Sequence, residues 1–214
     1  MNAVIFANGN FVATTYSDLI LKQAELIIAA DNGARYCLEH GVLPDVLVGD
    51  LDSLCPRVLK ELQVADTRIL LYPSEKNATD LELALDHLLT YQSVTDITIL
   101  GALGGRFDMS LSNIFLTSHP KYQYMKIKII DHQNLLYIIN AHHPLFLSGR
   151  AGDTISLLPL TSSVEGIETL NLRYALKNET LYAASTRGIS NQLTNSEAKI
   201  TVNKGVLLCV HSIV

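Results

Sequence analysis

Short apolar runs alternate with amphipathic stretches along the first part of the chain. The apolar runs have the length of buried strands, whereas the other stretches repeat apolar residues every three or four positions, which is the helical period. The runs that predict strands are residues 3–7, 26–30, 46–48, 68–72, 97–100 and 126–130. The stretches that predict helices are residues 18–24, 34–40, those after Pro56, those from Thr79, where Thr79 and Glu82 form a capping-box pattern, and those around Leu111. Strands that alternate with helices predict an α/β domain with a mostly parallel sheet.

The pattern changes after about residue 134. The remaining apolar or alternating runs are short, turn residues separate them, and no helical period is present. These runs are residues 135–139, 145–147, 154–158, 180–184, 199–202 and 206–211. We therefore predict an all-β sandwich as the second domain, with the α/β domain at residues 1–133 and the sandwich at residues 134–214.

Candidate chemistry lies where the predicted parallel strands end. Asp31, Asp50 and Gly101 all follow such strands, and ligands of parallel sheets bind at the carboxyl ends. In an extended segment Asp50 and Asp52 project to the same side about 7 Å apart, so that both can approach one Mg²⁺ ion. The alternative is a turn that caps the next helix, which is common for Asp and Ser. Asp80, in a first helical turn, would add an oxygen ligand or only complement the helix dipole.

A glycine-rich turn, residues 101–106, lies between a predicted strand and a predicted helix. Such a turn lets phosphate approach backbone N–H groups at the start of a helix. Its sequence is neither of the two common nucleotide-binding glycine patterns, so neither a dinucleotide fold nor a P-loop is supported. Arg106 can pair with phosphate through two hydrogen bonds, and Asp108 can cap the helix or reach a metal ion. Asp80 and Asp108 are both candidates for the general base of a reaction at this site.

Charge and composition limit the classes of molecule that the protein can bind. Only 17% of the 214 residues are charged and the net charge is −5, without a basic stripe for a nucleic acid or an anionic membrane. Nine of the twelve aspartates lie between Asp31 and Asp108, a concentration that indicates acidic turns or a bound cation. We interpret the low fraction of charged residues as an indication of a subunit interface.

The cysteines and the hydropathy pattern predict a cytoplasmic protein. The three cysteines are widely spaced and form no CxxC pair, which favours reduced thiols. The start of the chain lacks the basic segment of a signal peptide. The longest stretch free of Asp, Glu, Lys and Arg, residues 132–149, is too polar to cross a bilayer.

Taken in order, the motifs resemble the thiamine pyrophosphokinase family. They are Asp31-Asn-Gly-Ala34, Gly41-x-x-Pro44-Asp45, Gly49-Asp50-Leu-Asp52-Ser53, Lys76-x-x-Thr79-Asp80-x-Glu82, Gly101-Ala-x-Gly104-Gly105-Arg106-x-Asp108-x-x-Leu111-x-Asn113 and Gly188-x-Ser190-Asn191. The resemblance is dense over residues 31–115 and thin in the β half. It implies Mg²⁺-dependent transfer of a diphosphoryl group from ATP to thiamine, with release of AMP, by a homodimer whose active sites lie between subunits.

The resemblance also implies roles for individual residues. Asp50, Asp52 and Asp80 match the Mg²⁺-binding acids. The catalytic set is these three with Arg106 and Asp108, and the residues that match the ATP and phosphate neighbourhood are Asp31, Lys76, Thr79, Gly104, Gly105, Arg106 and Asn113. Ser190 and Asn191 match the motif that lines the thiamine pocket, and the β half is implied to bind thiamine and form the dimer.

Two positions depart from the family pattern. Asn77 and Met109 stand where the family often has Asp and His, and both changes bear on substrate contacts rather than on the three acids. Three alternatives stay open: a kinase or pyrophosphokinase for another alcohol such as a pterin, a non-catalytic nucleotide-binding regulatory module, and a Mg²⁺-dependent hydrolase.

Overall fold

The computed structural model describes residues 1–213, which form two compact units. Unit 1 comprises Met1–Leu116 and Ile130–His132, and unit 2 comprises Thr117–Ile129 and the chain from Gln133 onward. The chain therefore crosses between the units more than once near the predicted boundary, because Thr117–Ile129 packs with unit 2. The roles predicted for residues 1–133 and 134–214 stay predictions.

Unit 1 is built on five parallel strands in the spatial order β5-β1-β2-β3-β4. The strands are β1 Asn2–Phe6, β2 Leu26–Ala30, β3 Val46–Gly49, β4 Arg68–Leu71 and β5 Asp96–Leu100. The helices are α1 Thr15–Gln23, α2 Ala34–Glu39, α3 Pro56–Val64, α4 Asp80–Leu88 and α5 Phe107–Leu116, and a 3₁₀ turn, η1, covers Asp31–Gly33. This is the mostly parallel α/β fold that the alternating pattern predicts.

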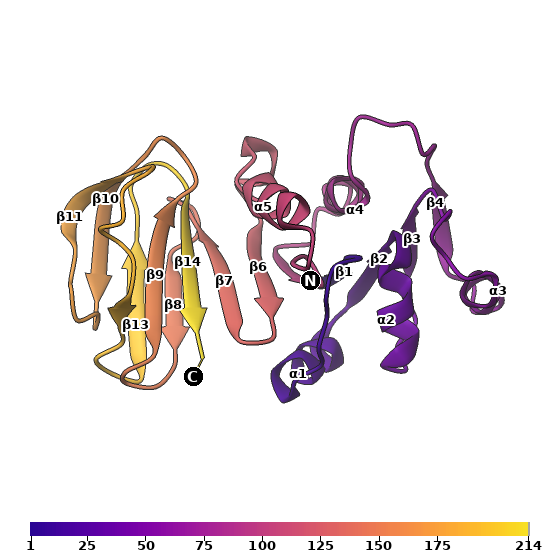
Figure 1. Ribbon diagram of the computed structural model, residues 1–214, viewed down its shortest axis with the longest axis horizontal. Coiled ribbons are helices and arrows are strands. Elements are labelled where there is room, and N and C mark those ends of the chain that lie inside the picture. Colours follow the sequence, from indigo (N-terminus) through magenta and orange to yellow (C-terminus); the bar gives the residue numbers. More distant parts are fainter. Residues whose placement is uncertain (214) are drawn as a thin grey trace. The chain divides into compact units, whose positions relative to one another are not determined.

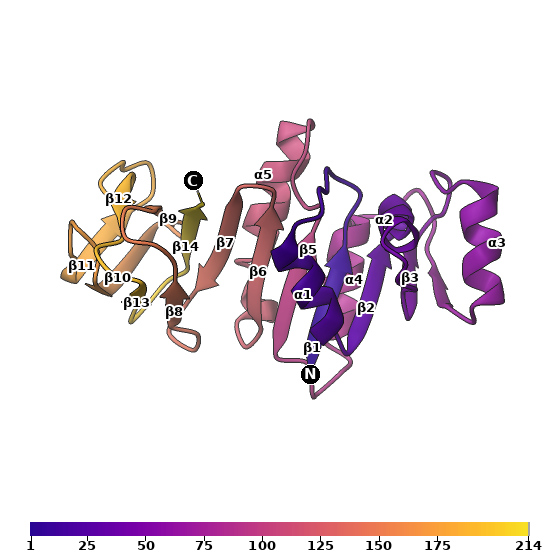
Figure 2. The same cartoon turned by 90° about the horizontal axis from the view of Figure 1, so that it is seen from below.

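Helices cover both faces of this sheet. Figures 1 and 2 show α1 and α2 on one face and α4 and α5 on the other, with α3 beyond the edge strand β4. Ile5, Ile28, Leu47 and Ile99 are consequently fully buried at the centre of their strands. Double coverage explains why these strands are continuous apolar runs rather than alternating ones. It also leaves the carboxyl ends of the strands as the place where polar side chains gather.

Unit 2 contains two antiparallel sheets that form a β-sandwich. One has the order β12-β9-β14-β7 and the other β11-β10-β13-β8. The strands are β7 Asn134–Ile139, β8 Leu145–Ser148, β9 Thr154–Pro159, β10 Ser163–Leu170, β11 Lys177–Tyr182, β12 Asn191–Gln192, β13 Glu197–Thr201 and β14 Leu207–Ser212. A 3₁₀ turn, η2 Pro120–Tyr122, precedes β6 Lys126–Asp131, whose residues belong to both units. The predicted all-β second region is confirmed.

The sequence pattern missed β10 and the two-residue strand β12. In β10, Gly166 adopts φ 67°, and the pairing with β11 shifts register between Val164 and Ile167. A glycine with positive φ at such an irregularity breaks the alternation of inward and outward side chains. The rule of alternation therefore does not detect this strand, although Val164 and Ile167 are both fully buried.

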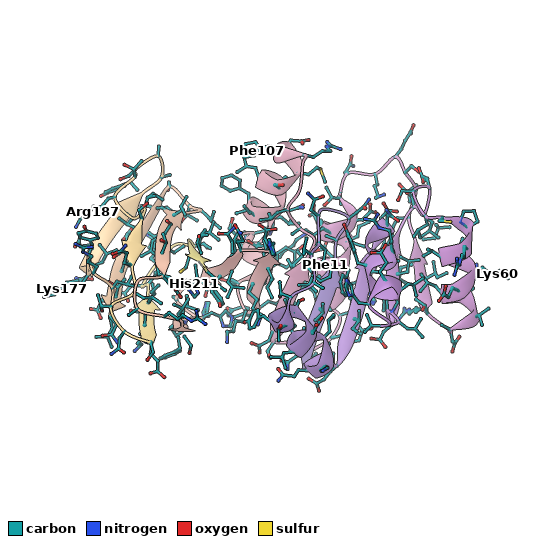
Figure 3. The ribbon with its side chains drawn as sticks, turned by 60° about the horizontal axis from the view of Figure 1, so that its bottom comes forward. Phe11, Lys60, Phe107, Lys177, Arg187 and His211 are labelled. Atoms are coloured by element: carbon teal, nitrogen blue, oxygen red, sulfur yellow. The ribbon has the colours of Figure 1, made fainter. Side chains whose placement is uncertain are left out.

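A buried hydrogen bond between an imidazole and a carboxylate lies inside unit 2. His211 on β14, labelled in Figure 3, places Nε2 2.7 Å from Oδ2 of Asp153, and both side chains are less than a tenth exposed. The same carboxylate accepts a hydrogen bond from the backbone N–H of Arg150. Burial raises the pKa of Asp153, but the Arg150 N–H and His211 outweigh it, so the pKa lies below its ordinary value of 3.8. Asp153 is therefore held as a carboxylate in the folded state.

This pair should make the stability of the protein depend on acid pH. A lowered folded-state pKa contributes stability above the unfolded pKa, and that contribution is lost as the pH falls through the folded pKa. We expect Asp153→Asn to lower the free energy of unfolding by about 2 kcal/mol at pH 7, because it removes a charge-assisted buried hydrogen bond. The difference from the wild type should shrink below about pH 4.

Urea unfolding of both proteins between pH 7 and pH 3 measures this difference. Glu168→Gln, an exposed change in the same unit, is the control and should have little effect at any pH. A difference between Asp153→Asn and the wild type that stayed constant across the acid range would contradict the assignment.

Within residues 1–213, no helix is long and apolar enough to cross a membrane.

Candidate functional site

A cavity of about 560 Å³ opens at the carboxyl ends of β1, β2 and β5 and beside the start of α4. Its walls come from the loop after β1, from the β4–α4 connection (residues 72–79) and from the glycine-rich turn with the first turns of α5. The lining residues are Ala7, Asn8, Gly9, Asn10, Ala30, Asp31, Ser74, Lys76, Ala78, Thr79, Asp80, Leu81, Ala102, Leu103, Gly104, Gly105, Arg106, Met109, Ser110 and Asn113. All of them belong to unit 1.

The loop after β1, residues 7–14, is bound to the glycine-rich turn by backbone hydrogen bonds. The N–H of Ala7 donates to Leu100 O (2.8 Å), that of Gly9 to Gly101 O (2.7 Å) and that of Asn10 to Leu103 O. A Cβ at Gly9 would lie 2.4 Å from the carbonyl oxygens of both Gly101 and Leu103, so only glycine permits this approach. The two loops therefore form one wall of the cavity.

Aromatic packing holds the far end of the same loop. Phe11, labelled in Figure 3, packs edge-on against the rings of Phe6, Tyr36 and His40. The Tyr36 hydroxyl donates to Gly9 O at 2.7 Å and accepts from the Phe11 N–H at 3.3 Å. Our sequence reasoning missed this loop as part of the site. It lies at the end of a parallel strand, so the rule that located Asp31 and Asp50 could have found it.

The glycine-rich turn has its own internal support. Gly101 adopts φ 66°, which favours glycine. Ser110 on α5, another residue that the sequence did not indicate, accepts from the Gly104 N–H at 3.0 Å. Asn113, predicted to be near the nucleotide, is buried and donates from Nδ2 to Ala102 O at 2.7 Å. A Cβ at Gly105 would meet nothing within 4 Å, so this part of the turn is open to a ligand.

Asp31 lines the cavity from the end of β2. It is 9% exposed and adopts φ 49°, a left-handed conformation that Asp tolerates better than most residues. Its Oδ2 accepts from the Ser53 hydroxyl at 2.6 Å and from Asn8 Nδ2 at 3.4 Å. Its Oδ1 is buried without a hydrogen-bond partner within residues 1–213. An unpaired carboxylate oxygen of this kind suits a cation or a hydrogen-bond donor of a ligand.

The segment from Asp50 to Asp52 is not extended, contrary to our expectation. Leu51 adopts φ 66°, and the Asp52 N–H folds back to donate to Asp50 Oδ1 at 3.2 Å. Asp residues favour this local turn because the side chain can accept from the backbone two residues later. The spacing argument for two parallel side chains was therefore wrong, although both acids lie next to the β4–α4 connection. Asp52 Oδ2 accepts from Ser74 Oγ at 3.0 Å.

The ammonium group of Lys76 lies between two of the predicted acids. Its Nζ is 3.3 Å from Asp50 Oδ2 and 3.1 Å from Asp80 Oδ1. Thr79, which caps α4, accepts from the Glu82 N–H at 3.2 Å and so places Asp80 in the first helical turn. This arrangement brings Asp50, Lys76 and Asp80 together. Lys76 and Asp80 line the cavity, whereas Asp50 and Asp52 lie behind Lys76 and Ser74 and do not line it.

The electrostatics around Lys76 are those of a crowded acidic site. Burial raises the pKa of Asp80, and the charges of Asp31 and Asp50 add to this effect against the opposing influence of Lys76. The pKa of Asp50 is lowered, chiefly by the Asp52 backbone N–H and with help from Lys76. Burial disfavours the charge of Lys76, yet its two carboxylate partners raise its pKa above the ordinary value. The acids thus stabilise a positive charge where they meet.

Arg106 and Asp108 form an exposed pair at the mouth of the cavity. Arg106 Nη2 is 2.6 Å from Asp108 Oδ2, and Nε is 3.3 Å from Oδ1. The pKa of Asp108 is lowered, mainly by the hydrogen bond from Arg106. Arg106 lines the cavity, whereas Asp108 does not. In this structure Asp108 therefore orients the guanidinium group rather than facing the other acids.

The two residues predicted to contact thiamine lie in unit 2. Ser190 is exposed, adopts φ 57° and donates from its backbone N–H to Ser156 Oγ at 3.1 Å. Asn191 is buried, and its side chain donates to Tyr174 O and accepts from the N–H groups of Tyr174 and Gln192. The Asn191 side chain is thus engaged with the backbone, which favours an indirect, positioning role. Contact with thiamine stays a prediction for both residues.

The donor set of unit 1 suits Mg²⁺. Asp50, Asp52 and Asp80 offer hard oxygen ligands, and a cationic group already lies between Asp50 and Asp80. Within residues 1–213, however, no three His, Cys, Asp or Glu side chains converge closely enough to hold a metal ion. The three acids contact Ser74 and Lys76 instead of one common point.

Comparison with known proteins gives one consistent result. The sequence model of the thiamin pyrophosphokinase catalytic domain matches residues 17–129, and that of the thiamin pyrophosphokinase vitamin B1 binding domain matches residues 142–207. The chain is 31% identical to the thiamine pyrophosphokinase of Bacillus subtilis (strain 168) over 199 residues, which are 93% of this chain and 91% of that protein.

Solved structures agree with the sequence matches. The crystal structure of thiamine pyrophosphokinase from Bacillus subtilis matches with a TM-score of 0.84 and 29% identity, covering 100% of this chain and 99% of that one. That of thiamin pyrophosphokinase from Geobacillus thermodenitrificans matches with a TM-score of 0.81 and 30% identity, covering 99% and 97%. The similarity therefore extends over both units.

Proposed function

The chain belongs to the thiamine pyrophosphokinase family, whose members form thiamine diphosphate from thiamine, and we propose that it does so by Mg²⁺-dependent transfer of a diphosphoryl group from ATP. In the proposed reaction the thiamine hydroxyl releases its proton to the solvent, and its oxygen bonds to the β-phosphorus of ATP. The bond from that phosphorus to the oxygen bridging it to the α-phosphate breaks, and AMP leaves. The carrying observation is the unit 1 cavity, in which glycine backbone, two cationic side chains and carboxylates meet at the ends of parallel strands.

The chain's own groups suit a triphosphate. The open backbone at Gly105 and the guanidinium group of Arg106 line the same wall, where they can bind phosphate oxygens. Asp108 keeps that guanidinium group oriented before the nucleotide arrives. Asp31, with its unpaired buried oxygen, can accept from a donor of the nucleotide. Phosphoryl-type transfer depends mostly on positioning of the substrates and neutralisation of phosphate charge. These residues can supply both.

We assign the Mg²⁺ ligands to Asp50, Asp52 and Asp80. When bound, Mg²⁺ neutralises phosphate charge and favours departure of AMP. Without a cation the carboxylates around Lys76 would repel ATP, and Lys76 alone balances only part of their charge. Thr79 and Gly104 serve the site indirectly, since Thr79 caps α4 and Gly104 is bound to Ser110.

The roles that we propose for unit 2, thiamine binding and dimer formation, rest on the family and the sequence. We propose that it contributes thiamine contacts through the Ser190–Asn191 motif and that two chains form a homodimer, which the low fraction of charged residues also favours. Sedimentation at micromolar concentration tests the dimer, and a monomeric profile would contradict it. Cys37, Cys55 and Cys209 are all free thiols, which is consistent with the proposed cytoplasmic location.

One assay tests the reaction. The purified protein is incubated with Mg²⁺ and ATP, with and without thiamine, and AMP, ADP and thiamine diphosphate are quantified. Thiamine-dependent AMP in equal amount to thiamine diphosphate is the expected result. Thiamine-dependent ADP would instead identify an ordinary kinase, and nucleotide loss without thiamine a hydrolase. Turnover only with another alcohol, or ATP binding without turnover on any of them, would reject the proposal.

A further inference from the structure

The β4–α4 connection contacts all three carboxylates that we assign to Mg²⁺. Ser74 Oγ donates to Asp52, and Lys76 Nζ forms ion pairs with Asp50 and Asp80 at 3.3 and 3.1 Å. These contacts link the end of β3 to the start of α4 through a segment that itself lines the cavity. Each of the three acids therefore has a side-chain partner from this segment, although Asp52 itself is exposed.

The position of the Lys76 ammonium group bears on metal binding. The side chains of Lys76, Asp50 and Asp80 are only 13%, 19% and 25% exposed, so the charges are poorly screened by water. A cation that lies within about 3.3 Å of both carboxylates takes the place from which a metal ion would bind them. An ammonium group and a metal ion at this place would repel each other at short range.

We propose that Lys76 is an internal counter-ion that blocks the metal site of the free protein and is exchanged when a metal–nucleotide complex binds. The proposal rests on the proposed function, since it takes Asp50, Asp52 and Asp80 as metal ligands. Lys76 lines the same cavity as Gly105 and Arg106, and its flexible stem lets the ammonium group turn from the carboxylates to the phosphates. Its positive charge is thus used twice, first to neutralise the acids and then to bind the nucleotide.

This exchange predicts weak metal binding in the absence of nucleotide. In the free protein Lys76 and Ser74 contact the three acids, Lys76 through ion pairs with Asp50 and Asp80 and Ser74 through a hydrogen bond to Asp52. A residue that only bound phosphate would leave the affinity for metal alone unchanged. Metal binding to the free protein therefore distinguishes the two roles.

The experiment measures Mn²⁺ binding to the full chain without nucleotide, by the electron paramagnetic resonance signal of free Mn²⁺. Lys76→Met removes the charge but keeps the length of the side chain, and we expect it to bind Mn²⁺ about tenfold more tightly than the wild type, or better. Lys76→Arg should bind as weakly as the wild type. Lys60→Met on α3, labelled in Figure 3, removes the same charge from an exposed position and should change nothing.

A second substitution locates the effect. Adding Asp80→Asn to Lys76→Met should abolish the gain in Mn²⁺ affinity, and thermal unfolding checks that each variant is folded. If Lys76→Met is unstable, Lys76→Gln replaces it. The proposal would be overturned if a folded variant without the Lys76 charge bound Mn²⁺ no more tightly than the wild type.

The outcome is independent of the assay for the reaction. Thiamine-dependent AMP from the wild type together with unchanged Mn²⁺ affinity in Lys76→Met would reject the counter-ion role alone. A gain in Mn²⁺ affinity without any thiamine-dependent AMP would reject the proposed reaction and leave the counter-ion role standing.

Discussion

Asp50→Asn should reduce the formation of thiamine diphosphate by about 100-fold or more, while the protein stays folded. Loss of one preorganised charged group at a phosphoryl-transfer site has an effect of this order on turnover. The substituted amide keeps an oxygen in the place of Oδ1, which can still accept from the Asp52 N–H and preserve the turn. Lys76 keeps Asp80 as a partner. The substitution therefore removes charge from the site with little change in the fold.

Turnover at saturating ATP and thiamine, measured over a range of Mg²⁺ concentrations, tests this expectation, and thermal unfolding tests the fold. Asp66→Asn is a matched control: Asp66 is exposed, lies in the same unit, and adopts φ 61°, which Asn also tolerates. It should retain full turnover. Near-normal turnover of Asp50→Asn at limiting Mg²⁺ would show that Asp50 is not a metal ligand.

The sequence predicted most of the unit 1 fold because the residues that favour each strand or helix locally are also those that its place in the buried sheet requires. Residues 26–30 and 46–48 are continuous apolar runs, as strands covered on both faces must be. Thr79 is followed by a helix that its side chain caps. The same pattern correctly placed Asp31, Asp50 and the glycine-rich turn directly after parallel strands.

Side-chain directions could not be obtained in this way. The left-handed conformation of Leu51 has no signal in a pattern of apolar and polar positions, and it changes the direction of Asp52. Lys76 is chemically indistinguishable in sequence from a solvated surface lysine until α4 and β3 place two carboxylates beside it. The Asn191 side chain is engaged with the backbone of Tyr174, a contact that the order of residues along the chain does not indicate. Such facts depend on contacts between distant residues, which spacing along the chain does not contain.

The loop after β1 shows how a site depends on backbone packing as well as on functional side chains. Gly9 has no side chain to contribute, but its N–H donates to Gly101 O, and two carbonyl oxygens take the space that a Cβ would need. Tyr36 then closes the loop by accepting from Phe11 and donating to Gly9. The position of the glycine-rich turn is therefore linked to that of a loop almost a hundred residues earlier in the chain.

Gly9→Ala should accordingly disrupt both stability and activity. The added methyl group would lie 2.4 Å from the carbonyl oxygens of Gly101 and Leu103, and backbone atoms cannot yield as a flexible side chain does. We expect the free energy of unfolding to fall by about 2 kcal/mol or more, as for other overpacking substitutions. Turnover should fall about tenfold or more, because displacement of the glycine-rich turn misplaces Arg106.

Gly105→Ala provides the matched control for stability, since it places the same methyl group in the same wall of the cavity. A Cβ at Gly105 meets nothing within 4 Å and its φ is not positive, so its free energy of unfolding should stay within about 0.5 kcal/mol of the wild type. Urea unfolding of the two variants, with turnover measured in parallel, shows whether a loss of stability comes from the close packing at Gly9 or from replacing any glycine of this wall by alanine. Equal stabilities for Gly9→Ala and Gly105→Ala would contradict the close packing of the two loops. Loss of stability in Gly9→Ala alone, accompanied by loss of turnover, would show that this contact shapes the cavity.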